Sequence, residues 1–402
     1  MSKFLAHSLL ALSLYAVAVA PCRAQDASDF KFNASYTEQN DSNLFRLPES
    51  ANTTAVLGRS SGAEQTSIAT VGMGVHLLQG LQAFDVDIGV VDYRHRNFQY
   101  LSFTATNYDA SWRWALTPSL SGSLTTERKE TLNSFADYQG YNVRNVHLDT
   151  STHLDGVYEV DGLWRILAGV AQSRQTNQQA VTSGDDTSSD SANAGLRYAF
   201  ASGSTVTYKL IASDGAYNNR ALTQSLLLDD RFNQIDHDFR VHLLLGEGTV
   251  ADANITHIHR SHPTFSQRDY SGFNVAAALN WALSGKSALV LGYAHELGSY
   301  ATANSNYTQT DRITLGPVWQ MSSKAQLALR TVWSQVEFLD TPGAIALGQR
   351  RDTNRDTTLS FNWQPRQRWT LTTAFQALSR GSNAPGLDYD SNVVSLSASY
   401  TY

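Results

Sequence analysis

The chain of 402 residues has one cysteine, eight prolines and only 16% charged residues. A single cysteine excludes a disulfide framework, and the composition excludes collagen-like, coiled-coil and disordered chains. The 30 Lys and Arg and 36 Asp and Glu give a net charge of −6 without any basic block, so we expect no nucleic-acid partner. What the chain does contain is 18 Tyr, 16 Phe and 8 Trp among many small polar residues, and this mixture favours strands.

Long hydrophobic runs are also missing, except for one near the N-terminus. It extends from Leu9 to Ala20 after Lys3, and small residues precede Gln25 at the −1 and −3 positions. This pattern is typical of a secretory signal peptide, here residues 1–24, because about 20 apolar residues are needed to span a bilayer. We therefore expect an exported chain in which residues 25–402 form a single domain.

The remaining apolar residues alternate with polar ones, as in residues 273–281 and 394–402. A period of two predicts strands with one apolar face and one polar face. Either an antiparallel sandwich in water or a membrane barrel with a polar interior has this pattern. The predicted strands have about 12 to 16 residues, whereas strands of soluble proteins average about five or six, so the length favours the barrel.

The connections alternate between short and long. Eight short turns, near residues 80, 118, 161, 203, 247, 285, 323 and 365, alternate with nine mostly longer polar stretches. The sum of seventeen connections predicts an all-β fold, a transmembrane antiparallel β-barrel of about 18 strands. Short turns on one side and long loops on the other are typical of bacterial outer-membrane barrels, so the expected location is the cell outer membrane, surrounded by its lipid.

Most tryptophans lie within about five residues of a predicted short turn. Indole rings prefer the headgroup level of a membrane, because the ring is apolar while its N–H can reach water. We therefore expect an aromatic girdle at that rim. It comprises Trp112, Trp114, Trp164, Trp281, Trp319, Trp363 and Trp369.

The polar faces of the strands carry charges of both signs. By the size rule, a barrel of 16 to 18 strands leaves an aqueous channel. Mutual pairing that stiffens the wall is favoured over substrate binding for these charges. The candidates that we expect to face the lumen are Asp85, Asp87, Arg113, Asp149, Asp155, Arg165, Arg197, Lys209, Asp238, Arg240, Arg330 and Asp356.

The first long loop, residues 38–62, contains apolar residues that a fully exposed loop does not need. They belong to the stretch Leu44, Phe45, Arg46, Leu47 and Pro48. The loop either folds inward as a plug or packs over the mouth of the barrel, and we favour the inward fold.

Three stretches resemble the EpsL family of outer-membrane barrels, which are associated with exosortase-linked exopolysaccharide gene clusters. They are Asn43–Pro48 (NLFRLP), Ala110–Trp114 (ASWRW) and Leu132–Tyr138 (LNSFADY). The resemblance covers most of the mature chain and is strongest over residues 30–170. It implies a conduit or accessory component in exopolysaccharide biosynthesis and export. The implied partners are the exopolysaccharide chain and periplasmic or inner-membrane export proteins; no residue roles are implied.

Two other functions stay open: a general diffusion porin for small solutes, and a lipid- or glycan-modifying enzyme. For the enzyme, His147, Asp149, His153 and Asp155 alternate on one inward face and could support acid–base chemistry, although a hydrogen-bonded ladder in the wall is favoured. The stretch 58–62 matches G-x-S-x-G but lacks the strand before it and the helix after it that a nucleophile requires.

A metal site is conceivable at His257 and His259, which share one face of a strand, with His262 nearby. Without a carboxylate or cysteine beside them, solvated imidazoles are favoured. We therefore predict no catalytic residue, no cofactor and no metal.

Overall fold

The computed structural model describes residues 28–136, 142–180, 182–224, 227–246, 248–302, 305–339 and 349–402. The expected signal peptide lies outside these residues. The first nine strands are β1 (Ser28–Asp41), β2 (Glu64–Gln79), β3 (Gln82–His95), β4 (Phe103–Thr117), β5 (Leu120–Leu132), β6 (Val146–Glu159), β7 (Trp164–Asn177), β8 (Thr187–Ala199) and β9 (Thr205–Tyr217).

The second nine strands are β10 (Arg231–Gly246), β11 (Thr249–Ser261), β12 (Tyr270–Ser284), β13 (Ser287–Thr302), β14 (Ser305–Ser322), β15 (Ala325–Leu339), β16 (Arg351–Arg366), β17 (Trp369–Ser382) and β18 (Tyr389–Thr401). Short helices lie in the connections: α1 (Thr53–Leu57) and the 3₁₀ helices η1 (Gln99–Leu101), η2 (Ser183–Asp185) and η4 (Ser266–Arg268).

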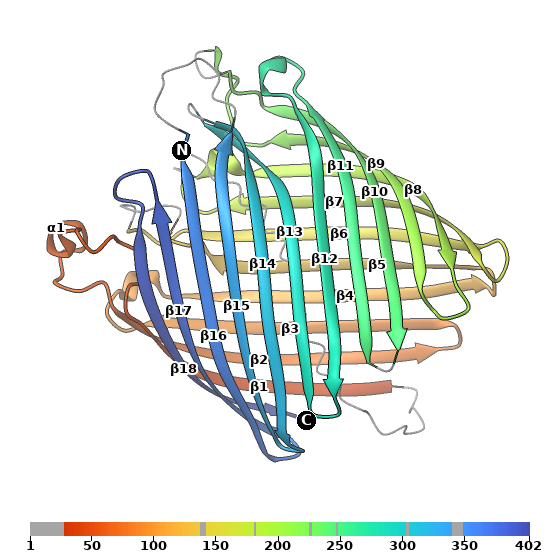
Figure 1. Ribbon diagram of the computed structural model, residues 1–402, viewed down its shortest axis with the longest axis horizontal. Helices are drawn as coiled ribbons and strands as arrows, with labels where there is room; N and C mark the ends of the chain where they lie inside the picture. The colour runs from red at the N-terminus through yellow and green to blue at the C-terminus, as the bar shows by residue number, and fades with distance from the viewer. Residues whose placement is uncertain are drawn as a thin grey trace.

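The strands form one closed antiparallel sheet (Figure 1). Each strand pairs with its neighbours in sequence, and β1 pairs with both β2 and β18, which joins the two ends. Closure matters because hydrocarbon offers no partner for a free edge of N–H and C=O groups. The predicted barrel of 18 strands is therefore confirmed.

Two predicted boundaries differ from those of the structure by a few residues. The turn expected near Pro365 follows Arg366, and Pro365 itself belongs to β16, where the register with β17 shifts between Trp363 and Arg366. Proline has no N–H to donate, and a bulge tolerates this loss. One of the nine polar stretches expected to connect strands begins at residue 299, but residues 299–302 belong to β13 and residues 305–306 to β14, because polar strands can continue beyond a membrane where water solvates them.

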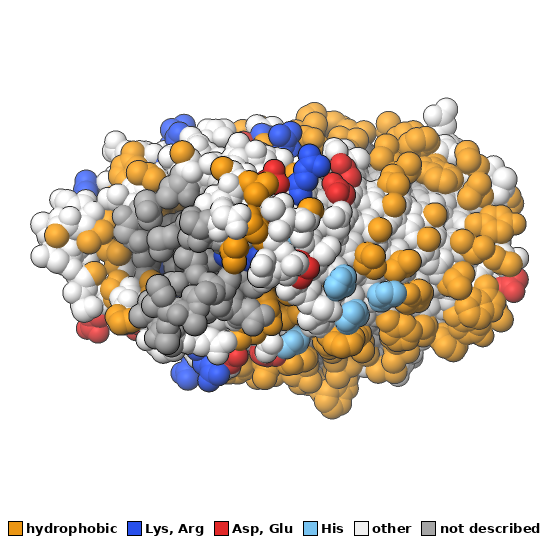
Figure 2. Space-filling view, turned by 90° about the horizontal axis from the view of Figure 1, so that it is seen from above, with side chains coloured by type: hydrophobic (Ala, Val, Ile, Leu, Met, Phe, Trp, Pro, Cys, Tyr) orange, Lys and Arg blue, Asp and Glu red, His pale blue; other side chains and the backbone are white. Residues whose placement is uncertain are grey.

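Exposed apolar side chains alternate along the strands and cover the outer face over one half of the barrel. Figure 2 shows this area as a broad belt of hydrophobic side chains, with charged and polar side chains towards the other end. Among the residues that the structure describes, no helix is long and apolar enough to cross a bilayer.

The tryptophans of the expected girdle belong to this outer face. One of them, Trp114, lies against Gly122 of the next strand, where a Cβ in place of the glycine hydrogen would approach the indole ring to 2.3 Å. The other six are between 39% and 49% exposed: Trp112, Trp164, Trp281, Trp319, Trp363 and Trp369. Their role as a headgroup girdle stays a prediction.

Candidate functional site

All twelve residues predicted to face the lumen lie on the inner face of the barrel. Each is an odd number of positions away from an exposed apolar side chain of its own strand, as Asp85 is from Val86 and Arg197 is from Leu196. The side chains of Arg113 and Arg240 are both 58% exposed and that of Arg330 is 50% exposed. Since these side chains point inward, water has access to the interior at their levels.

Most of the charged wall residues are paired. Arg113 lies 2.6 Å from Asp85, where His76 also binds the carboxylate. Asp149 lies 3.2 Å from His147, which is charged only when protonated. The remaining pairs among the predicted residues and their neighbours are Arg165 with Glu159 (3.3 Å), Lys209 with Asp155 (3.7 Å), Arg240 with Asp238 (2.7 Å) and Arg330 with Asp356 (3.7 Å).

Three arginines form a row across adjacent strands of the inner wall. Arg165 of β7 is directly opposite Arg197 of β8, Arg197 is opposite Thr207 of β9, and Thr207 is opposite Arg240 of β10. We call Arg165, Arg197 and Arg240 the basic row. Because barrel strands tilt by about 35–45°, a row perpendicular to the strands climbs along the barrel axis.

Arg197 differs from the two outer members of the basic row. Its Nε donates to Thr207 Oγ1 at 3.0 Å, and within the described part of the chain no carboxylate oxygen lies within 4 Å of it. Arg165 and Arg240 each have a carboxylate partner. The middle guanidinium therefore offers hydrogen-bond donors and a positive charge that no neighbouring acid neutralises.

The first long loop packs into an apolar cluster at the loop end of the barrel. Phe45 is 2% exposed and its ring centroid lies 4.7 Å from that of Phe98 and 4.6 Å from that of Phe135. Leu47 and Leu101 complete the buried set. Leu44 packs against this cluster from the edge. The apolar residues of the predicted plug thus have buried partners from two other loops.

The inner wall is also buried where the loops begin. Asp41, Glu64, His95 and Ala105 lie at the loop ends of β1 to β4 on the inward face, and all four are buried. Nearer the short turns the inner face is mixed: Leu167 and Thr207 are buried, while the side chain of Arg113 is 58% exposed. The inward fold of the loop and its effect on conductance stay predictions.

Buried carboxylates tie the loops together, and sequence reasoning missed them. Glu64 accepts hydrogen bonds from the backbone N–H groups of Arg96 (3.1 Å), Asn97 (2.8 Å) and Phe98 (2.7 Å). Asp229 accepts from the N–H groups of Thr264 (2.7 Å) and Phe265 (3.1 Å). No local pattern marks these residues, because their partners come from distant loops.

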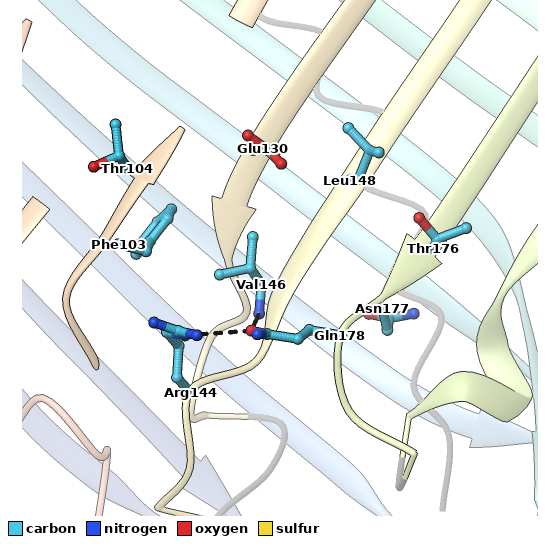
Figure 3. Close-up of a pocket in the computed structure, with 9 residues that line it drawn as sticks. All are labelled: Phe103, Thr104, Glu130, Arg144, Val146, Leu148, Thr176, Asn177 and Gln178. Atoms are coloured by element: carbon cyan, nitrogen blue, oxygen red, sulfur yellow. Dashed lines mark hydrogen bonds between the residues drawn. The ribbon is translucent and has the colours of Figure 1, made fainter. Parts of the chain in front are cut away.

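Strands β4 and β5 are no longer paired near the loops. Their backbone pairing ends at Tyr108 and Arg128. Beyond this point side chains accept the backbone hydrogen bonds: Thr106 N–H donates to the Glu130 carboxylate at 3.0 Å, and Glu130 N–H donates to the Asn107 side chain at 2.8 Å. A cavity of about 470 Å³ lies here (Figure 3). Its lining consists of Phe103, Thr104, Glu130, Arg144, Val146, Leu148, Thr176, Asn177 and Gln178.

The three histidines considered for a metal do not form one site. His257 and His259 lie on the outward face of β11, while His262 lies beyond its end, beside Asp269. Within the described residues, no group of three or more His, Cys, Asp or Glu could hold a metal ion. In the set considered for catalysis, Asp149 contacts His147 while Asp155 pairs with Lys209, so the four residues do not form one constellation.

No family model matches the chain, and no curated protein matches it. Solved structures with the same fold include Pseudomonas aeruginosa OpdK with vanillate (12% identity, 93% of this chain and 99% of that chain, TM-score 0.53). They also include P. aeruginosa OccK2 (OpdF) with glucuronate (12%, 93% and 98%, 0.54) and a BenF-like porin from Pseudomonas fluorescens Pf-5 (10%, 93% and 99%, 0.53). The chain is thus similar in fold, along nearly its whole described length, to outer-membrane porins.

Proposed function

We propose that this chain is an outer-membrane channel that passes small anionic solutes through its lumen. The observation that carries the proposal is the basic row, in which Arg197 stands between two other arginines and has no carboxylate partner among the residues that the structure describes. A guanidinium presents donors in a planar fork that matches a carboxylate, so an anion at this level can exchange its water for these donors.

The arrangement suits passage better than capture. Arg165 and Arg240 are held by Glu159 and Asp238, so an anion that leaves Arg197 meets cations whose charge is partly neutralised. Because the row climbs along the axis, these contacts follow one another along the route instead of surrounding the anion at one level. Weak sites in sequence allow entry and exit, which conduction requires.

The structural neighbours support this class of function. They are outer-membrane porins, which are channels without enzymatic activity. This supports a channel function and an outer-membrane location for the present chain. Two of them contain vanillate and glucuronate, which are both carboxylates. This chain has the two features that a barrel channel in a membrane requires: an apolar belt on the outer face and a polar interior that water can reach.

The test is ion selectivity in planar bilayers, measured as the reversal potential in a KCl gradient. The unmodified channel should prefer chloride, and Arg197→Gln should lower the anion-to-cation permeability ratio by about twofold or more. The matched control is Arg94→Gln, which removes the same charge beside Asp92 on the outer face. A cation-selective channel, or equal ratios for Arg197→Gln and the unmodified chain, would refute the proposal.

Exopolysaccharide export is the second candidate and rests on the resemblance at Asn43–Pro48 and Ala110–Trp114, of which residues 43–48 fold into the apolar cluster. A liposome-swelling assay with graded sugars separates the two functions. A diffusion channel passes small sugars freely, whereas a gated exporter with a periplasmic or inner-membrane partner does not.

A further inference from the structure

Four histidines lie in one region of the outer face of the barrel. They are His237 on β10, His257 and His259 on β11, and His295 on β13, and we call them the histidine patch. His237 is directly opposite His257, and both have the parity of exposed apolar residues of their strands, such as Phe239 and Ile255. Their side chains therefore point away from the lumen.

The histidine patch lies near the loop-side end of the apolar belt; on β10 the exposed Ile235 lies one outward position nearer the long loops than His237. On β11 the outward residues change from Ile255 to His257, and on β13 they change from Tyr293 to His295. Figure 2 shows histidine side chains at the edge of the hydrophobic area. In a bilayer, this is the depth at which the headgroups of the loop-side leaflet begin.

Neutral groups hold two of the imidazoles in place. Tyr208 Oη lies 2.8 Å from His237 Nδ1, and Ser271 Oγ lies 3.2 Å from His257 Nε2. The ring of His257 packs against Phe273 with centroids 4.9 Å apart. These contacts orient the rings in a continuous row from β9 to β12 without adding a charge.

The charges around the patch leave three of the histidines without an acidic partner. On β14, Asp311 binds His295 at 2.8 Å and accepts from Tyr293 at 3.0 Å. The outward groups on β9 and β12 that contact the patch are the neutral Tyr208, Ser271 and Phe273. Across the described residues, no carboxylate lies within ion-pair distance of His237, His257 or His259. Protons taken up by these three would therefore create a positive surface that the protein does not neutralise.

We propose that the histidine patch binds the phosphate of an anionic lipid headgroup in the loop-side leaflet, and binds it more tightly at acidic pH. Histidine usually takes up its proton between pH 5 and 8, and protonated imidazoles both attract a phosphate and donate hydrogen bonds to it. Lipid is the favoured occupant because the patch is continuous with the apolar belt, on which the acyl chains of the same lipid would lie. The proposal does not depend on the conducting function of the lumen.

The experiment measures lipid binding to the purified full chain in a zwitterionic detergent by native mass spectrometry at pH 5.5 and 7.5. The probes are diphosphoryl lipid A, phosphatidylcholine and inorganic phosphate. We expect lipid A to bind at pH 5.5 about tenfold more tightly than at pH 7.5, and more tightly than either other probe. The triple variant His237→Gln, His257→Gln and His259→Gln should lose this pH dependence.

Two controls keep the result specific. Arg355→Gln removes a cation from the outer face of β16, far along the sheet, and should keep the pH-dependent binding. His153→Gln removes an inward histidine and should also keep it. The heat-dependent shift of a folded barrel on a gel verifies that each variant folds.

The proposal would be overturned by equal binding at both pH values, by unchanged binding in the triple variant, or by inorganic phosphate binding as tightly as lipid A. The last would indicate a site for free anions. Loss of binding on addition of a chelator would also overturn it, because a metal ion would then bridge the imidazoles and the lipid.

Discussion

Arg46 holds Asp41 through two parallel hydrogen bonds, from Nη1 to Oδ1 at 2.8 Å and from Nη2 to Oδ2 at 2.7 Å. Asp41 ends β1, and Arg46 lies five residues later with a φ of +53°, so the pair folds the start of the first loop back onto the wall. Ser391 of β18 donates to the same carboxylate at 2.6 Å. The loop is therefore fixed at the point where the first and last strands meet.

Replacing Arg46 should loosen the first loop. Arg46→Ala leaves the Asp41 carboxylate, of which 4% is exposed, without its cation, and breaking a buried pair in this way costs about 3 kcal/mol. Limited proteolysis should then cleave the loop between residues 42 and 63 faster than in the unmodified protein. Arg355→Ala, on the outer face, should leave the cleavage rate unchanged; equal rates for both variants would contradict the role of the pair.

Removing the first loop should widen the channel. Deletion of residues 41–50 takes away Phe45 and Leu47, which pack into the apolar cluster at the loop end. Single-channel conductance in planar bilayers should rise because the inner wall there is no longer covered. The milder variant Phe45→Ser should increase brief openings. A folded deletion variant with the original conductance would show that the loop is no plug.

The carboxylate of Asp85 should reduce the anion selectivity that the basic row produces. Asp85→Asn keeps the shape but removes the charge that neutralises Arg113, 2.6 Å away on the lumen wall. The anion-to-cation permeability ratio should rise by about twofold, the reverse of the change expected for Arg197→Gln. The matched control is Asp92→Asn, because the Asp92 carboxylate pairs with Arg94 on the outer face. This variant should leave the reversal potential unchanged.

Gly122 should not tolerate a side chain. A Cβ there would approach the carbonyl oxygen of Asp155 to 2.2 Å and the Trp114 ring to 2.3 Å, so Gly122→Ala should cost about 1–3 kcal/mol of folding stability through overpacking. Gly156 is directly opposite Gly122, and its Cβ would meet only the Ala168 carbonyl at 3.8 Å. Urea unfolding in detergent should show the loss for Gly122→Ala and little change for Gly156→Ala.

The loop after β11 should detach in acid. Burial tends to raise the pKa of Asp229, but the N–H groups of Thr264 and Phe265 outweigh it and hold this pKa below its usual range. A lowered pKa in the folded state means that the stabilisation is present above about pH 4 and is lost as the pH falls through the folded value. Hydrogen exchange at residues 264 and 265 should accelerate below pH 4, and Asp229→Asn should abolish that dependence.

The sequence by itself determined the number of strands and the face on which each residue lies. Alternation with a period of two is a local property of a strand, so residues 394–402 or 273–281 reveal their outward side without any knowledge of their neighbours. Turn residues are local signals as well, so the alternation of short and long connections could be predicted from the sequence. The inward position of Arg197 and the outward position of Trp363 follow from these two signals.

Only the tertiary structure decided which residues are neighbours across strands. Arg165, Arg197 and Arg240 belong to β7, β8 and β10, and they align because the register of three separate strand pairs brings them into one row. Likewise, Glu64 finds its partners more than 30 residues away, in the loop after β3. Register depends on the packing and hydrogen bonding of the whole closed sheet, which no local stretch of sequence contains.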